Sequence, residues 1–203
     1  MRLKVSRLSY EDLQAQVDTL LRQHNPTGKI PVPIEKIVEF GFGLTLVPIH
    51  DLQTVYEVDA FTAKDLQTIY VDHATMMSRS PYRYRFSLAH ELAHVVLHRP
   101  IYKEVHFRSA AEWKKMMLAM DEADRSWIEW QANNFAGLLL VPRAPLRSAM
   151  QKAVTQAAEH GLDVRGCAEV AKDYVCEGLS RTFEASGQVI AIRVEKDGLW
   201  PPT

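Results

Sequence analysis

One stretch of the chain decides how the rest is interpreted: YRYRFSLAHELAHVVLH, residues 82–98. It contains the pattern H-E-x-x-H, with histidines at His90 and His94 and Glu91 directly after the first of them. On a helix, residues four apart lie on one face with Cβ atoms about 5–6 Å apart, so both imidazoles can bind one Zn²⁺ at ~2.0–2.1 Å. Glu91 is the next residue around the helix, where it can reach a water molecule beside the metal. The spacing predicts the active site of a metal-dependent hydrolase.

Local signals predict that this stretch is a helix packed into a core. Ser80 offers a capping hydroxyl, Pro81 suits the first helical position and Pro100 stops the helix, so we expect it to run to about His98. Phenylalanine, leucine and valine flank the motif. Because two histidines and a glutamate are costly to bury without partners, this context favours a role in binding a metal.

A catalytic zinc site takes three protein ligands and leaves one position open. Glu129 is the best third candidate, because it shares one face of a predicted helix at 123–140 with Asn133 and two alanines. A carboxylate on a face of small residues indicates close approach to another helix. The alternatives are Glu112 in a charged stretch, and Glu122 and Asp124 at the helix start, where the helix dipole alone favours acids.

Further polar side chains can support a ligand or the oxyanion that forms during hydrolysis. His98 lies four residues after His94, and a metal at the level of His90 and His94 is a turn away from it. A contact from His98 to a ligand, or a buried histidine with an ordinary packing role, is therefore favoured over direct coordination. The candidates for a supporting role are His98, Asn133 and Tyr84. Other candidate oxyanion donors, which the sequence does not rank, are His73, His106, Tyr82 and Tyr102.

The composition of the 203 residues is that of an ordinary globular protein, with 47% hydrophobic and 24% charged residues. The net charge of −1 argues against binding to nucleic acid by bulk charge. No apolar run approaches the ~20 residues of a membrane-spanning helix, and no apolar segment follows the basic N-terminus, so we expect a cytoplasmic protein that contacts no membrane. Cys167 and Cys176 cannot form a disulfide framework, and we expect both to be reduced.

The pattern along the chain predicts an α+β fold in one domain, residues 1–203, with a small, mostly antiparallel sheet packed on a helical body. We expect residues 1–142 to form a core with the active-site helices, and 143–203 to form a helical C-terminal extension with a last strand. The expected strands are 44–49, 55–62, 67–72 and 188–194. The expected helices are 9–24, 33–40, 80–98, 109–119, 123–140, 145–161, 165–173 and 177–185.

Two parts of the chain resemble the ImmA/IrrE family of bacterial and phage metallopeptidases. Residues 84–98 resemble its active-site helix, R-F-[ST]-x-A-H-E-L-G-H-x-x-x-H. Residues 129–142 are similar to its second motif, E-x-x-A-N-x-F-A-x-x-L-L-x-P. Residues 31–37 and 68–72 also match the usual N-terminal helix and strand of the family.

The chain departs from the family pattern in two places. Ala93 stands where the family usually has glycine, which leaves the ligands unchanged. The stretch between the two motifs, residues 99–125, is longer than usual. This insertion is a candidate to cover the cleft or to bind a partner.

The resemblance implies a zincin-like metallopeptidase fold that holds one Zn²⁺ per chain. Its ligands would be His90, His94 and Glu129, and Glu91 would be the general base of a zinc-dependent endopeptidase. It also implies a role in gene control, with a transcriptional repressor or regulator of a phage, mobile element or stress response as substrate. The expected partner is a helix-turn-helix repressor encoded nearby. We further expect an extended substrate to pair with the strand at 67–72, which lies just before the active-site helix.

Two other functions are compatible with parts of the sequence. One is a non-catalytic protein that sequesters a regulator or toxin, but such a protein has no need of Glu91. The other is direct DNA binding through a helix pair at 165–185, with a turn at Val175-Cys176. Residues 163–187 carry a net charge of −2, whereas a recognition helix is normally basic. Helices that pack within the fold are therefore the favoured interpretation of this pair.

Overall fold

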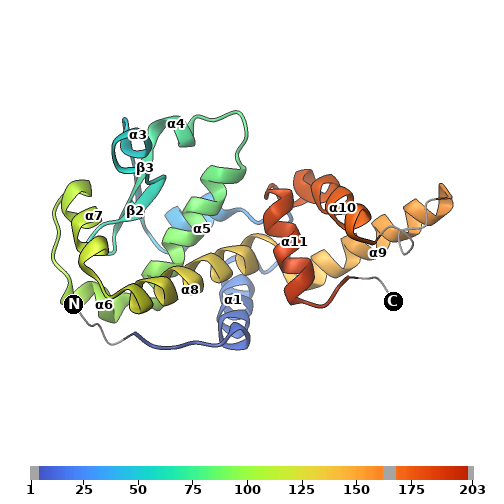
Figure 1. Cartoon of the computed structure of the whole chain (residues 1–203), viewed down its shortest axis with the longest axis horizontal. Helices are drawn as coiled ribbons and strands as arrows, with labels where there is room; N and C mark the ends of the chain where they lie inside the picture. The colour runs from blue at the N-terminus through green and yellow to red at the C-terminus, as the bar shows by residue number, and fades with distance from the viewer. Residues whose placement is uncertain (1–4, 162–167, 201–203) are drawn as a thin grey trace.

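The computed structural model describes residues 5–161 and 168–200, except for the side chains of 168–170. Two long helices, α5 (Tyr82–Leu97) and α8 (Glu122–Leu140), pack against each other in the middle of the molecule (Figure 1). A small sheet lies toward one end of the pair and the C-terminal helices lie toward the other (Figure 1). This helical body with a small sheet confirms the predicted α+β class of fold.

Small side chains bring α5 and α8 close together. Ala89 and Ala93 on α5 and Ala132 and Ala136 on α8 are all fully buried. Alanines at these positions let the two helix backbones approach, which is the packing that the face of small residues predicted. The α5 helix starts slightly later than expected, because Pro81 is its N-cap residue and no side chain caps it.

The sheet has three strands, and its central strand is β3. The strands are β1 (Thr45–Ile49), β2 (Ala60–Thr62) and β3 (Thr68–Asp72), in the order β1-β3-β2. β1 runs parallel to β3, and β2 runs antiparallel to it. The expectation of a mostly antiparallel sheet is therefore wrong, and the sheet is mixed. The expectation that a substrate adds to the strand at 67–72 is also wrong, because β3 is paired on both edges.

The expected strand at 55–62 is a short helix followed by a short strand. Leu52–Tyr56 form α3, and β2 begins only at Ala60. Leu52 is buried, and Tyr56 one helical turn later packs partly buried against the same small apolar cluster. Tertiary packing therefore overrides the local preference of this segment for a strand.

Most of the other predicted helices are present. The first helix, α1 (Tyr10–His24), is capped by Ser9 and packs on α8, and α7 (Ala110–Ala119) occupies most of the predicted 109–119. The predicted helix near 33–40 is α2 (Ile34–Lys36) followed by the π-helical turn η1 (Ile37–Gly41). The remaining short helices before the C-terminal region are α4 (His73–Met76) and α6 (Arg99–Glu104).

The C-terminal region is helical among the residues that the structure describes. It contains α9 (Arg143–Glu159), α10 (Ala168–Phe183) and α11 (Gly187–Lys196). α10 runs through Val175 and Cys176 without a turn, so the predicted helix-turn-helix spacing is wrong there. The start of the predicted helix at 165–173, together with Cys167, lies outside the described residues. Cys176 is free and buried.

The expected last strand at 188–194 is wrong, because this segment is α11. Ser186 caps the helix by accepting a hydrogen bond from the backbone of Val189. Ile190 and Val194, four residues apart, are fully buried, whereas Ile192 between them is 44% exposed. A strand would bury all three on one face, so the β-branched residues of this segment follow a helical period.

Buried apolar residues form two clusters. The larger cluster lies around α1, α5, α8 and the C-terminal helices. The smaller cluster lies between the sheet and α6–α7, and includes Phe61, Ile101 and Met120. The predicted insertion at 99–125 therefore forms a wall with its own core. Among the described residues, no helix is long and apolar enough to cross a membrane.

Candidate metal centre

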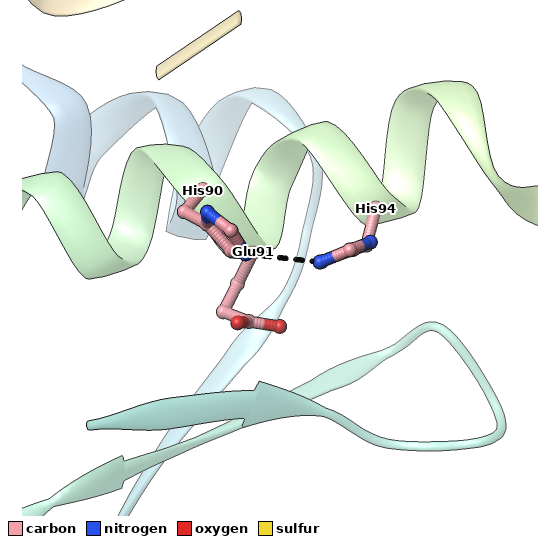
Figure 2. Close-up of side chains that lie close together, drawn as sticks. All are labelled: His90, Glu91 and His94. Atoms are coloured by element: carbon pink, nitrogen blue, oxygen red, sulfur yellow. Dashed lines mark hydrogen bonds between the residues drawn. The ribbon is translucent and has the colours of Figure 1, made fainter. Parts of the chain in front are cut away.

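His90 and His94 lie on consecutive turns of α5, and their Nε2 atoms are 3.1 Å apart. Two ligands at ~2.0–2.1 Å from a tetrahedral zinc ion lie about 3.3 Å apart, so the two imidazoles fit a shared metal. Figure 2 shows both rings and the side chain of Glu91 near each other on the side of α5 that faces the strands. One ligand-type atom from each of His90, Glu91 and His94 lies within 4.8 Å of the others.

The Nδ1 atoms of His90 and His94 each contact a further polar side chain. The His90 Nδ1 atom lies 3.0 Å from Asn133 Oδ1, and the His94 Nδ1 atom lies 2.9 Å from His98 Nδ1. Partners at Nδ1 orient an imidazole and leave its Nε2 lone pair available to a metal. His98 is thus placed behind His94, and Asn133 beside His90, as expected for supporting residues; their roles stay predictions.

Burial keeps two of the histidines neutral. It holds the pKa of His94 well below the ordinary value, with the neighbouring His90 and His98 acting in the same direction. Burial also lowers the pKa of His98 to about 4. A neutral imidazole is the form that binds a metal, so the surroundings of His94 suit a ligand.

The carboxylate of Glu129 on α8 reaches the paired imidazoles. Its Oε2 atom lies 3.2 Å from His90 Nε2, and its Oε1 atom lies 3.9 Å from His94 Nε2. Burial alone lowers the pKa of His90, but the carboxylates of Glu129 and Glu91 outweigh burial and raise it. Two imidazoles and one carboxylate therefore meet from two helices, and this donor set fits a zinc ion.

Glu91 points from α5 toward the edge strand β2 (Figure 2). Its side chain is buried, and Oε2 accepts a hydrogen bond of 2.8 Å from the Thr62 hydroxyl. Burial raises the pKa of Glu91 to about 7, against weaker opposing contributions from His90 and Thr62. A carboxyl group with a pKa near neutrality can both accept and return a proton. Thr62 was not a sequence candidate, because nothing local links a strand residue to a glutamate 29 positions away.

Two of the candidate tyrosines, Tyr102 and Tyr84, lie in different parts of the structure. Burial, Glu91 and Glu129 raise the pKa of Tyr102 well above its ordinary value, and its ring centroid lies 6.4 Å from that of His94. Tyr102 therefore lies at the metal centre. Tyr84 lies elsewhere: its pKa rises to about 12 through burial and the carboxylates of Glu35 and Glu39 on the N-terminal helices. The prediction of Tyr84 as an oxyanion donor does not agree with this position.

The remaining candidate donors and acids lie outside the group of Tyr102, Glu91 and Glu129. The His73 ring stacks on His50 with centroids 4.3 Å apart, and Tyr82 lines a groove beside α5. His106 is exposed on the connection between α6 and α7. The Glu112 carboxylate accepts a hydrogen bond from the backbone N–H of Arg108, just before α7, and Glu122 is the first residue of α8.

The fold and the HExxH helix define the class of the protein, which is a zincin-like metallopeptidase domain. The sequence pattern of Peptidase M78, the IrrE N-terminal-like domain, matches residues 76–195, which is more than half of the chain. The chain therefore belongs to the Peptidase M78 family of IrrE N-terminal-like domains, as the resemblance in the two motifs indicated.

Similarity to other proteins is distant. No curated protein sequence matches the chain. A solved structure described as a Mycobacterium tuberculosis transcriptional regulator is similar in fold, with a TM-score of 0.56 and 17% sequence identity. The match covers 91% of this chain but only 46% of that protein, so the chain spans less than half the length of its structural relative.

Proposed function

We propose that the protein is a zinc-dependent endopeptidase in which His90, His94 and Glu129 hold the metal and Glu91 is the general base. The observation that carries this proposal is the meeting of His90 Nε2 with His94 Nε2 at 3.1 Å and with the Glu129 carboxylate at 3.2 Å. When bound, zinc acidifies a water molecule and polarises a peptide carbonyl. His98 and Asn133 orient the two imidazoles through their Nδ1 atoms.

Glu91 moves the proton that hydrolysis requires. Its carboxylate accepts a proton from the attacking water, whose oxygen forms a bond to the carbonyl carbon. The same proton passes to the nitrogen as the C–N bond breaks, so the products are a carboxylic acid and an amine. The Thr62 hydrogen bond at 2.8 Å holds one carboxylate oxygen in place during this transfer. The Tyr102 phenol, kept protonated by its surroundings, is the candidate donor to the oxyanion.

The proposed substrate is a transcriptional regulator, cleaved in an extended segment. Two observations support this class: the chain belongs to the IrrE N-terminal-like family, and a protein of similar fold is described as a transcriptional regulator. β2 is one of the two edge strands of the sheet, and it is the one beside the site, since Thr62 contacts Glu91. A substrate strand would therefore pair with β2 rather than β3.

The test is cleavage of the expected partner, a helix-turn-helix regulator encoded nearby, followed by mass spectrometry of the fragments. We expect the zinc-loaded protein to cut the regulator at one site and a chelator to stop the reaction. Glu91→Gln should retain one zinc ion per chain and lose cleavage by ~10²–10⁴-fold. If Glu91→Gln cuts as fast as the parent protein, the assigned base is wrong, and binding without any cut would instead favour sequestration.

A further inference from the structure

A large groove opens on one side of the metal centre. It has a volume of about 730 Å³ and lies between the first half of α5, the second half of α8 and α11. Its lining includes Phe86, Trp130, Asn133, Val189, Ile192 and Lys196. It is the volume of a peptide segment of a few residues rather than of a single water or ion.

Two side chains connect the groove to the metal centre. Asn133 lines the groove and also contacts His90 Nδ1 at 3.0 Å. Trp130, which lines it too, is the residue directly after the predicted ligand Glu129. The ring of Phe86 lies 6.5 Å from that of His90, centroid to centroid. The groove therefore lies next to His90 and Glu129, on the Nδ1 side of the His90 ring.

Part of the lining of the groove is apolar, and α11 contributes to it. Phe86 and Trp130 contribute aromatic rings, while Val189 and Ile192 contribute aliphatic side chains from α11. Ile192 is one of the most exposed large apolar residues among those described, at 44%. An exposed isoleucine that lines the same concave site as two aromatic rings is suited to a large apolar side chain.

The charge in the groove is carried by Lys196. Its ammonium donates a hydrogen bond of 2.6 Å to Asn134 Oδ1 and lies 5.2 Å from the centre of the Trp130 ring. Among the side chains that the structure describes, no carboxylate forms an ion pair with it. The other cations of the lining are neutralised, Arg83 by Asp59 at 2.7 Å and Arg193 by Asp197 at 2.8 Å.

We propose that this groove binds the substrate on one side of the scissile bond, taking a large apolar side chain against Phe86, Trp130 and Ile192 and an acidic side chain at Lys196. The inference rests on the proposed peptidase function. Ile192 and Lys196 lie four residues apart on α11, with Cβ atoms about 5–6 Å from each other, and an extended chain advances about 3.3 Å per residue, so the acidic residue would lie roughly two positions from the apolar one. The two contacts together define a sequence preference for the cut.

The test uses the zinc-loaded full chain and a library of peptides from a tryptic digest of a bacterial proteome. Mass spectrometry of the new termini gives the residues that flank each cut. We expect cuts beside large apolar residues, with acidic residues enriched nearby about two- to fivefold, as for a partly exposed ion pair. Lys196→Glu should convert the acidic preference into a basic one, and Lys196→Met should abolish it. Lys152→Glu, an exposed lysine on α9 outside the groove, is the matched control and should change nothing.

The apolar contact is tested in the same library. Ile192→Asp should lower cutting beside large apolar residues about tenfold or more relative to small ones. Val55→Asp, at a residue on α3 that is 62% exposed, is its control. Unchanged acidic preference in Lys196→Glu, together with unchanged apolar preference in Ile192→Asp, would overturn the proposal.

A binding measurement separates failure of this inference from failure of the proposed function. The same library is passed over immobilised zinc-loaded Glu91→Gln protein, with and without Lys196→Glu, and the retained peptides are identified. If the parent protein cuts no peptide, the peptidase function fails, but selective retention of acidic, apolar peptides that requires Lys196 still supports the groove. Equal retention by both proteins would refute it.

Discussion

The two ends of the metal centre are built differently. At the His94 end, α6 and α7 form a closed wall: His94, His98, Tyr102 and Trp113 surround a cavity of only about 20 Å³. At the His90 end, Asn133 separates the ring of His90 from the groove of about 730 Å³ that α11 completes. The exposed fraction of the side chain follows the same order, at 8% for His94 and 16% for His90. One end of the centre is therefore closed by packed side chains, and the other lies beside the groove that we propose as the substrate site.

The two ends of the metal centre are also built from different segments of the chain. The closed end is made by α6 and α7, which lie between the two motifs in the sequence, while the open end is completed by α11, which follows both motifs. Each end has one residue on the free nitrogen of a predicted ligand, His98 behind His94 and Asn133 beside His90. We expect the closed end to determine stability and metal retention more than the open end.

The largest expected effect comes from removing a ligand at the closed end. His94→Ala should lose stoichiometric zinc, because two remaining ligands cannot form the three-ligand site of a catalytic metal. Elemental analysis after dialysis should show about one zinc per chain for the parent protein and almost none for the variant. His50→Ala, which removes a histidine outside the centre, should retain zinc; equal zinc in His94→Ala would refute the assignment.

The next effect concerns the core of the closed wall. Phe61 on β2 is 3% exposed, and its ring lies 5.0 Å from that of Tyr70 and 5.5 Å from that of Trp113. Phe61→Ala should lower the free energy of unfolding by about 3–5 kcal/mol, because it leaves a cavity. Ile192→Ala at the open end should cost under about 1 kcal/mol. Urea denaturation of the metal-free proteins measures both, and similar losses would contradict the comparison.

A pH effect follows from the buried Glu91 in the metal-free protein. Its pKa is raised to about 7 in the folded state from an ordinary value of 4.5, so ionisation of this group opposes folding. The cost is absent below pH 4.5, grows as the pH rises through this window, and is complete above about pH 7. Glu91→Gln should therefore be more stable than the parent protein at pH 8, by up to about 3 kcal/mol, and similar at pH 4.5. Thermal unfolding with a chelator at both pH values checks this, and a stability difference independent of pH would contradict it.

The smallest expected effect is on zinc affinity, when the contact between Asn133 and His90 at the open end is removed. Asn133→Ala removes the hydrogen-bond partner of His90 Nδ1 and should weaken zinc binding by about 10–100-fold. Competition with a chromogenic chelator measures this affinity. Asn134→Ala is the matched control, since that side chain contacts Trp130 and Lys196 instead of a histidine. If both variants bind zinc equally well, Asn133 does not support the ligand.

Much of the site was predictable because it depends on local geometry. The spacing of His90 and His94 places both imidazoles on one face of a helix whatever the rest of the chain does. The face of small residues around Glu129 predicted close packing of α8 on another helix, and Ala89, Ala93, Ala132 and Ala136 form that contact. The residues behind the ligands, His98 and Asn133, follow from the same two helical periods.

What the sequence alone determined was thus the helix that carries His90, Glu91 and His94 and the helical face of Glu129. Only the tertiary structure decided which tyrosine reaches the centre, that Thr62 holds Glu91, that β3 is central and that α11 is a helix lining a groove. These features depend on contacts between residues far apart in the chain, such as Thr62 and Glu91, which are 29 positions apart. Short-range propensities do not encode such contacts, and in α11 packing against the core prevailed over the strand preference of its β-branched residues.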